Sequence, residues 1–219
     1  TLFRSEIMAK SGFDFLIVDM EHGPGDVLTL MSQLQAINAY GVDVIVRAPW
    51  NDFVTIKRIL DVGTHGVHVP YVNTKEETIA AVKACKYPPE GNRGIAGSPR
   101  ASGYGMNSRN YLENANKEIL VYVALETPTA VANLDDILTV EGVDGIFIGP
   151  ADLSTSMGHF FNPSHPEVQE TIRKIEEKVL KTNKFLGTVA SDFEAAKKLY
   201  DRGYQLLIAM SDSGVLATS

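Results

Sequence analysis

The chain of 219 residues carries 20 Lys and Arg against 27 Asp and Glu, so its net charge is −7, and it has no basic block that would favour nucleic acid. Hydrophobic residues at 44% and charged residues at 21% are typical of globular domains, and no apolar run reaches the roughly 18 to 20 residues of a membrane span. Cys85 is the only cysteine, which excludes an intrachain disulfide and a thiolate metal cluster. These values predict a soluble protein of a reducing cytoplasm, with neither nucleic acid nor membrane as a partner.

Seven apolar runs bounded by turn residues are predicted to form strands. They occupy residues 13–19, 42–47, 66–72, 119–125, 143–148, 184–189 and 204–210. Helix-like segments lie between them, at residues 26–40, 52–62, 75–87, 129–140, 166–182 and 191–202. Several of these segments begin with an acidic or hydroxyl residue that can cap a helix. The alternation indicates repeated βα units.

The predicted strands are apolar at nearly every position, which is typical of parallel sheets covered by helices on both faces. No glycine-rich dinucleotide fingerprint follows any of these strands. A further helix-like segment at residues 5–10 precedes the first run. The sequence therefore predicts a single domain over residues 1–219. Its expected fold is a (β/α)8 TIM barrel of the α/β class, with the first strand and the last helix outside this chain.

Residues 88–117 interrupt the alternation. The segment contains Pro88, Pro89 and five glycines, which disfavour a regular helix or strand. We expect it to form an ordered excursion over the barrel mouth and to contribute to substrate selectivity.

Two carboxylates stand where predicted strands end. Glu126 follows residues 119–125, and Asp152 follows residues 143–148. Each has an ordinary alternative, since Glu126 could complement a helix macrodipole and Asp152 could cap a helix that begins at Leu153. Together they favour a hard divalent cation with open positions for substrate and water, either Mg²⁺ or Mn²⁺, with Co²⁺ as a third candidate.

Three further polar residues stand at the ends of earlier strands: Asp19, His22 and Arg47. Asp19 could hydrogen-bond the His22 ring and fix its tautomer for general acid or base work, although a loop histidine of no special role is the ordinary alternative. Arg47 ends an apolar run, where a charge is costly unless it is paired. It could form a structural ion pair, or hold a carboxylate or a developing enolate oxygen.

Other candidates carry weaker signals. His65 and His68 are expected to be hydrogen-bonded inside the barrel, and His159 and His165 are expected to lie in a polar loop. Neither pair shows metal-site spacing with a third ligand. Lys184 opens its predicted strand and does not end it, which disfavours amine catalysis. Cys85 is predicted to be an inert apolar residue of a helix.

Several ungapped stretches carry a family resemblance. They are FDFLIVDMEHGP at 13–24, VRAPWND at 46–52, LDVG at 60–63, YPPEGNRG at 87–94 and GVDGIFIGPADLS at 142–154. From residue 1 to about residue 216 the chain resembles the metal-dependent pyruvate aldolases of the HpcH/HpaI family, typified by 4-hydroxy-2-oxoheptanedioate aldolase. The resemblance implies a TIM barrel, a hexamer, and reversible cleavage of 4-hydroxy-2-oxo acids to pyruvate and an aldehyde through a metal-stabilised enolate.

The same resemblance implies roles for individual residues. It makes Glu126 and Asp152 the metal ligands, Arg47 the pyruvate-binding and enolate-stabilising residue, and Asp19 with His22 a dyad for proton transfer. The main-chain amides of Ala151 and Asp152 would bind the substrate carboxylate. Aldehyde selectivity is expected around residues 188–190, which include Val189. One departure is Ala124, because the family usually has Gln at this position, and this predicts altered specificity or activity.

Two rival functions remain open at this stage. The same metal–enolate chemistry could serve oxaloacetate decarboxylation or condensation with another acceptor. A non-catalytic barrel kept for binding or assembly is the alternative of a different class.

Overall fold

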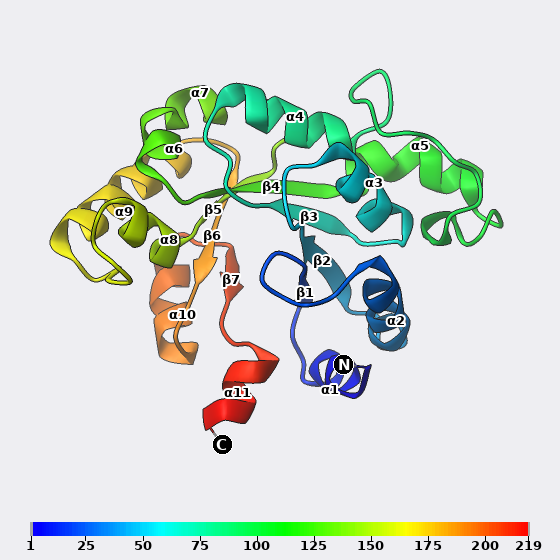
Figure 1. Ribbon diagram of the computed structural model, residues 1–219, viewed down its shortest axis with the longest axis horizontal. Coiled ribbons are helices and arrows are strands. Elements are labelled where there is room, and N and C mark those ends of the chain that lie inside the picture. The colour runs from blue at the N-terminus through cyan, green and yellow to red at the C-terminus, as the bar shows by residue number, and fades with distance from the viewer. Residues whose placement is uncertain (1, 219) are drawn as a thin grey trace. The chain divides into compact units, whose positions relative to one another are not determined.

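The computed structural model describes residues 2–218 (Figure 1). All seven predicted strands are present. They are β1 Phe15–Asp19, β2 Asp43–Arg47, β3 Gly66–Val69, β4 Leu120–Leu125, β5 Gly145–Ile148, β6 Phe185–Val189 and β7 Leu206–Ile208. They follow one another in the sheet in chain order, and the pairs β1–β2, β2–β3, β4–β5, β5–β6 and β6–β7 are parallel. The prediction of parallel strands in an α/β fold is confirmed.

Helices connect the strands. They are α1 Leu2–Lys10, α2 Val27–Asn38, α3 Phe53–Asp61, α4 Lys75–Cys85, α5 Ser108–Glu118, α6 Pro128–Ala132, α7 Leu134–Leu138, α8 Pro150–Ser156, α9 Pro166–Val179, α10 Phe193–Asp201 and α11 Asp212–Thr218. A short 3₁₀ helix, η1, covers Arg100–Ser102. The helix predicted over residues 129–140 is divided at Asn133, which ends α6 and precedes α7. Helices α5 and α11 were not predicted from the sequence.

The prediction of a (β/α)8 TIM barrel is wrong. The strand order runs once from β1 to β7, and within residues 2–218 no ladder joins β7 back to β1. A closed barrel requires every strand to pair on both of its sides. The βα alternation is common to closed barrels and open sheets, so it could not decide between them.

The chain divides into two compact units. Unit 1 consists of Thr1–Pro70 and Ile79–Val121, and unit 2 consists of Tyr71–Thr78 and Tyr122–Ser219. The expectation of a single domain over residues 1–219 stays a prediction.

The core of unit 1 is formed by strand residues that are buried without interruption. Val44, Ile45 and Val46 of β2 are buried, and α3 turns Ile56 and Ile59 inward. The helix begins where the sequence predicts, because the Asp52 carboxylate accepts a hydrogen bond from the Thr55 amide at 2.7 Å. Such a cap contributes about 1 kcal/mol. Helix α1 packs beside α2 (Figure 1).

The expectation that residues 88–117 lie over the barrel mouth is wrong. Arg93 Nη2 donates to Asp61 Oδ1 at 2.8 Å, and Arg100 Nη1 donates to the Val62 carbonyl at 2.6 Å. Both acceptors lie at the end of α3, where the chain turns toward the first residue of β3. The segment is therefore anchored near the amino end of β3. Proline and glycine identified a loop, but the buried Arg93 guanidinium decides where it docks.

In unit 2 large and small side chains alternate between neighbouring strands. Two rows of the sheet show this: Tyr122, Gly145 and Phe185, and then Ala124, Phe147 and Gly187. The Tyr122 and Phe185 rings have centroids 5.4 Å apart, and a Cβ atom on Gly145 would come within 2.4 Å of the Phe185 ring. Ala124, where the chain departs from the family pattern, thus lies in this packed layer. Its methyl group is fully buried and neighbours Phe147.

No helix among residues 2–218 combines the length and the apolar character needed to cross a bilayer.

Candidate functional site

In unit 1 three polar residues occupy one row at the carboxyl ends of adjacent strands. The register aligns Asp19 of β1 with Arg47 of β2, and Arg47 with His68 of β3. Side chains at aligned positions of parallel strands project to the same face. The chain can turn sharply after β1 because residue 23 is glycine, where a Cβ atom would lie 2.1 Å from the Asp19 carbonyl oxygen. Register and turn together gather the polar residues.

Arg47 is held by two carboxylates. Its Nε donates to Asp19 Oδ1 at 2.8 Å and its Nη2 to Asp19 Oδ2 at 2.6 Å, which is the bidentate pairing that suits a planar guanidinium. Its Nη1 lies 3.2 Å from Glu21 Oε2. The side chain is 24% exposed, so the pair is partly desolvated. The guanidinium is therefore fixed in orientation by the protein itself.

Asp19 is kept ionised in this arrangement. Burial alone would raise its pKa, but the hydrogen bonds and charge of Arg47, together with the Glu21 and His22 amides, hold the pKa of Asp19 below its usual value. The Glu21 amide donates to Asp19 Oδ1 at 3.0 Å and the His22 amide donates to the same oxygen at 3.3 Å. Such an anion is a poor proton acceptor near neutral pH and a good anchor for Arg47.

His22 is placed differently from the sequence-based expectation. Asp19 contacts its main-chain amide, and the carboxylate nearest its ring is that of Glu21, with Nε2 and Oε2 3.8 Å apart. The His22 side chain is 68% exposed. The imidazole is thus available to solvent or substrate beside the Arg47 cluster. Its proton-transfer role stays a prediction.

His68 is a candidate that sequence reasoning set aside. Its side chain is 1% exposed, and it lies next to Arg47 in the row. Desolvation, followed by repulsion from Arg47, lowers the pKa of His68 to about 3. At neutral pH the ring is therefore uncharged and can both donate and accept a hydrogen bond.

In unit 2 the Glu126 carboxylate is buried directly after β4. It is 5% exposed, and its Oε2 accepts a hydrogen bond from the Tyr71 amide at 3.2 Å. Tyr71 has a φ of 55°, a left-handed conformation that costs about 1 kcal/mol in a residue other than glycine. The strained residue directs its N–H group at the carboxylate.

The segment that carries Tyr71 is fastened to the end of β4. Asn73 Oδ1 accepts a hydrogen bond from the Thr127 hydroxyl, and Asn133 Nδ2 donates to the Asn73 carbonyl at 2.8 Å. Thr127 also caps α6 by accepting from the Ala130 amide at 3.1 Å. These hydrogen bonds therefore fix the two backbone segments that flank the Glu126 carboxylate, one at Asn73 and one at Thr127.

Asp152 lies in the first turn of α8 and is exposed. The helix starts at Pro150, directly after Gly149, whose amide extends the β4–β5 ladder by donating to the Leu125 carbonyl at 3.2 Å. A Cβ atom on Gly149 would lie 2.6 Å from Glu126 Oε1. Glycine at this position is what allows the Glu126 carboxylate to lie against the start of the Asp152 segment.

The chemistry of these two side chains fits a hard divalent cation, and their role as its ligands stays a prediction. Glu126 and Asp152 offer carboxylate oxygens as ligands, and the Tyr71 amide and the glycine at position 149 orient the Glu126 carboxylate. Mg²⁺ and Mn²⁺ prefer such oxygens to nitrogen or sulfur.

The remaining predicted residues are at strand ends of unit 2. Ala151 follows Pro150 in α8, and Val189 is the last residue of β6, with 45% of its surface exposed. Thr188 is buried and donates through its hydroxyl to the Ile148 carbonyl at 2.9 Å, so it supports the sheet. Val189 is thus the accessible residue of this strand end.

Sequence reasoning missed several residues that shape these two clusters. Glu21 gave a signal, because it stands two positions after Asp19 on the same turn. Gly149 also stood within a quoted motif. The Tyr71 amide gave none, since main-chain conformation is set by other parts of the chain. His68 was expected to be buried, as it is, but its place beside Arg47 was not predicted.

Comparisons with known proteins agree along nearly the whole chain. Residues 4–218 match the family model described as HpcH/HpaI aldolase/citrate lyase. The 4-hydroxy-2-oxo-heptane-1,7-dioate aldolase of Escherichia coli strain ATCC 8739 is 41% identical over 215 residues, which cover 98% of this chain and 82% of that protein.

Solved structures give the same result. The crystal structure of an HpcH/HpaI aldolase/citrate lyase family protein from Burkholderia cenocepacia J2315 is 33% identical, with a TM-score of 0.95 over 100% of this chain and 87% of that one. The crystal structure of the citrate synthase SbnG is 30% identical, with a TM-score of 0.89 over 100% of this chain and 85% of that one.

Proposed function

Because the chain belongs to the HpcH/HpaI aldolase/citrate lyase family and is thereby an enzyme of the aldolase and lyase class, we propose that it cleaves a 4-hydroxy-2-oxo acid reversibly to pyruvate and an aldehyde. The family resemblance predicted from the sequence is confirmed, and the non-catalytic alternative is wrong. The substrate class rests on the 41% identical relative from Escherichia coli, which is named for such a substrate.

One observation carries the proposal: the buried Glu126 carboxylate, seated against Gly149 and oriented by the Tyr71 amide. Glu126 and Asp152 would hold a divalent cation, either Mg²⁺ or Mn²⁺, with Co²⁺ as a third candidate. When bound, such a cation supplies a Lewis acid that polarises the 2-oxo group of the substrate.

Arg47 would bind the developing enolate oxygen. Asp19 occupies its Nε and Nη2 edge, so a substrate oxygen would approach from the Nη1 side, where the contact to Glu21 is longer at 3.2 Å. Because the guanidinium is already oriented, little reorganisation is needed as negative charge develops. Asp19 is then a positioning residue for Arg47.

The exposed His22 ring would carry the proton of the 4-hydroxyl group. Loss of that proton drives cleavage of the C3–C4 bond, the electron pair passes into the enolate of pyruvate, and the aldehyde leaves. Protonation of C3 then completes pyruvate. The Ala151 and Asp152 amides would bind the substrate carboxylate, and Val189 would contact the aldehyde part.

Metal removal combined with a pyruvate-release assay tests the proposal. After exhaustive chelation, pyruvate release from a 4-hydroxy-2-oxo acid should fall to background and return when Mg²⁺ or Mn²⁺ is added. Glu126→Gln should lose activity by about 1,000-fold, because a ligand is lost. The exposed Glu141→Gln is the matched control and should retain activity. Full activity without metal, or near-normal turnover by Glu126→Gln, would contradict the proposal.

A second candidate is decarboxylation of oxaloacetate or condensation of an enolate with another acceptor. Two observations support this second candidate: a citrate synthase is 30% identical to the chain, and Ala124 departs from the family's usual Gln. Both activities should be measured on one preparation. A kcat/KM for oxaloacetate decarboxylation that exceeds the value for aldol cleavage would favour this candidate.

A further inference from the structure

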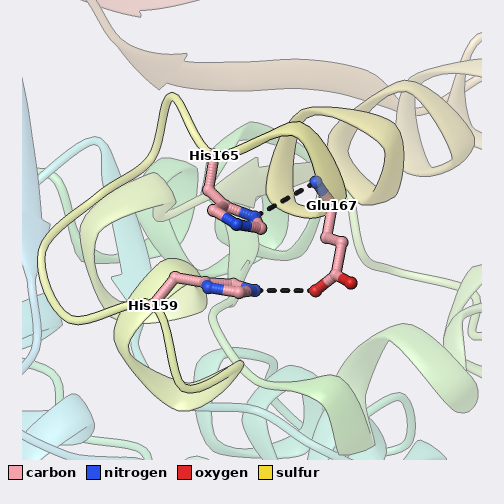
Figure 2. A group of neighbouring side chains, drawn as sticks. All are labelled: His159, His165 and Glu167. Carbon is pink, nitrogen blue, oxygen red and sulfur yellow. Dashed lines mark hydrogen bonds and ion pairs between the residues drawn. The ribbon is translucent and has the colours of Figure 1, made fainter.

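A cluster of three potential metal ligands lies in unit 2 outside the residues assigned above. One nitrogen of His159, one nitrogen of His165 and one carboxylate oxygen of Glu167 all lie within 4.8 Å of one another. The two imidazole rings are stacked, with centroids 3.5 Å apart and planes inclined by 15°. Figure 2 shows both rings beside Glu167. His159 Nε2 lies at hydrogen-bonding distance from Glu167 Oε2, 2.8 Å away.

The main chain already fixes both histidines. The His159 amide donates to the Ser154 carbonyl of α8 at 2.8 Å, and the His159 carbonyl accepts from the Asn162 amide at 3.0 Å. The His165 amide in turn donates to the Asn162 carbonyl at 3.1 Å. His165 then precedes α9, where its Nδ1 accepts from the Glu167 amide at 3.3 Å. The ligands are therefore presented by an ordered connection between two helices.

Helix capping accounts for only part of this geometry. The bond from the Glu167 amide to His165 Nδ1 caps α9, and it does not require His159. The His159 ring and the Glu167 carboxylate lie beside His165 as well, so three potential ligand atoms are within 4.8 Å of one another. In a tetrahedral zinc site with bonds of about 2.0 to 2.1 Å, ligand atoms are about 3.3 Å apart. An imidazole nitrogen binds a metal along a lone pair in the plane of the ring, so metal binding would require the two rings to turn out of their stacked arrangement.

We propose that His159, His165 and Glu167 bind one Zn²⁺ ion, or a similar transition-metal ion, and so tie the end of α8 to the start of α9. Two imidazoles and one carboxylate select such a metal over Mg²⁺, which prefers oxygen ligands. Glu167 is 72% exposed, which leaves room for water as a fourth ligand. The site does not depend on the proposed aldolase activity.

Zinc titration of the metal-free protein, with Mg²⁺ in large excess to occupy oxygen sites, tests this proposal. Isothermal titration calorimetry should show one equivalent of Zn²⁺ per chain, and Co²⁺ should give the visible absorption of a tetrahedral site. His159→Gln and Glu167→Gln should each weaken Zn²⁺ binding by about tenfold or more, because each removes one ligand.

Glu170→Gln is the matched control, because it changes an exposed carboxylate of the same helix by the same charge. It should bind Zn²⁺ like the unaltered chain. Zn²⁺ should also raise the thermal midpoint of the unaltered chain and of Glu170→Gln, but not of His159→Gln, since binding stabilises the folded state alone. Absence of Zn²⁺ binding under excess Mg²⁺, or equal binding by His159→Gln and Glu167→Gln, would overturn the proposal.

Discussion

The two units place their acidic groups in different surroundings. In unit 1 the carboxylates of Asp19 and Glu21 share the guanidinium of Arg47, at 2.6 Å and 3.2 Å. In unit 2 Glu126 is buried against a main-chain amide and Gly149. The chain thus supplies its own cation to the first cluster, whereas we propose that the cation at Glu126 comes from solution.

This difference teaches how the two clusters should respond to change. An internal ion pair depends on the shape and direction of its hydrogen bonds, so it should be sensitive to the form of the cation. A carboxylate that binds a metal ion, as we propose for Glu126, depends on free space and on the positions of the other ligands. Substitutions that keep charge but alter shape therefore separate the two cases.

Among the three substitutions that test this comparison, Arg47→Lys should have the largest effect. Lysine keeps the positive charge but cannot form the two-pronged pair with Asp19, so kcat/KM for pyruvate release should fall by about 100-fold. Steady-state kinetics measure this, and circular dichroism checks that the variant is folded. The exposed Arg58→Lys is the control and should behave as the unaltered chain. A loss below about threefold would show that charge alone matters in unit 1.

His68→Leu sharpens the comparison through pH. The folded-state pKa of His68 is lowered to about 3, so between pH 6.5 and 3 the unfolded chain binds a proton that the folded chain does not. This contribution to the free energy of unfolding is complete above the unfolded pKa and is lost as pH falls. Between pH 7 and pH 5 the free energy of unfolding should fall by about 2 kcal/mol through this residue, and this pH dependence should be absent in His68→Leu.

Urea unfolding at both pH values measures this difference. Val67→Ala on the same strand is the control, because it lowers stability at both pH values and keeps the titrating ring. If the unaltered chain and His68→Leu lose the same stability between pH 7 and pH 5, burial does not lower the pKa of His68 as expected.

Gly149→Ala should give the smallest effect and act on unit 2 alone. The backbone of Gly149, with φ −94° and ψ 90°, is open to alanine, so the change acts by placing a methyl group 2.6 Å from Glu126 Oε1. Displacement of the carboxylate should weaken Mn²⁺ binding by about tenfold, measured by calorimetry. Gly97→Ala is the control, since nothing lies within 4 Å of its Cβ position. Unchanged Mn²⁺ affinity in Gly149→Ala would contradict the assignment of Glu126 as a metal ligand.

Local patterns account for the elements that were predicted correctly. The largely apolar residues 42–47 and 143–148 became β2 and β5, because a strand covered on both faces favours apolar side chains. Helix α3 starts where Asp52 can cap it. Closure of the sheet and the docking of residues 88–117 were mispredicted, because both depend on partners distant in sequence.

The same division applies to the candidate residues. The sequence by itself determined which polar groups stand at strand ends, because Asp19, Arg47, Glu126 and Asp152 interrupt or follow apolar runs. Only the tertiary structure decided what each one touches: Asp19 pairs with Arg47 and the His22 amide, Glu126 meets the Tyr71 amide, and His159 meets Glu167. The physical reason is that composition and period are properties of neighbouring residues, whereas pairing, burial and pKa shifts arise between segments that folding brings together.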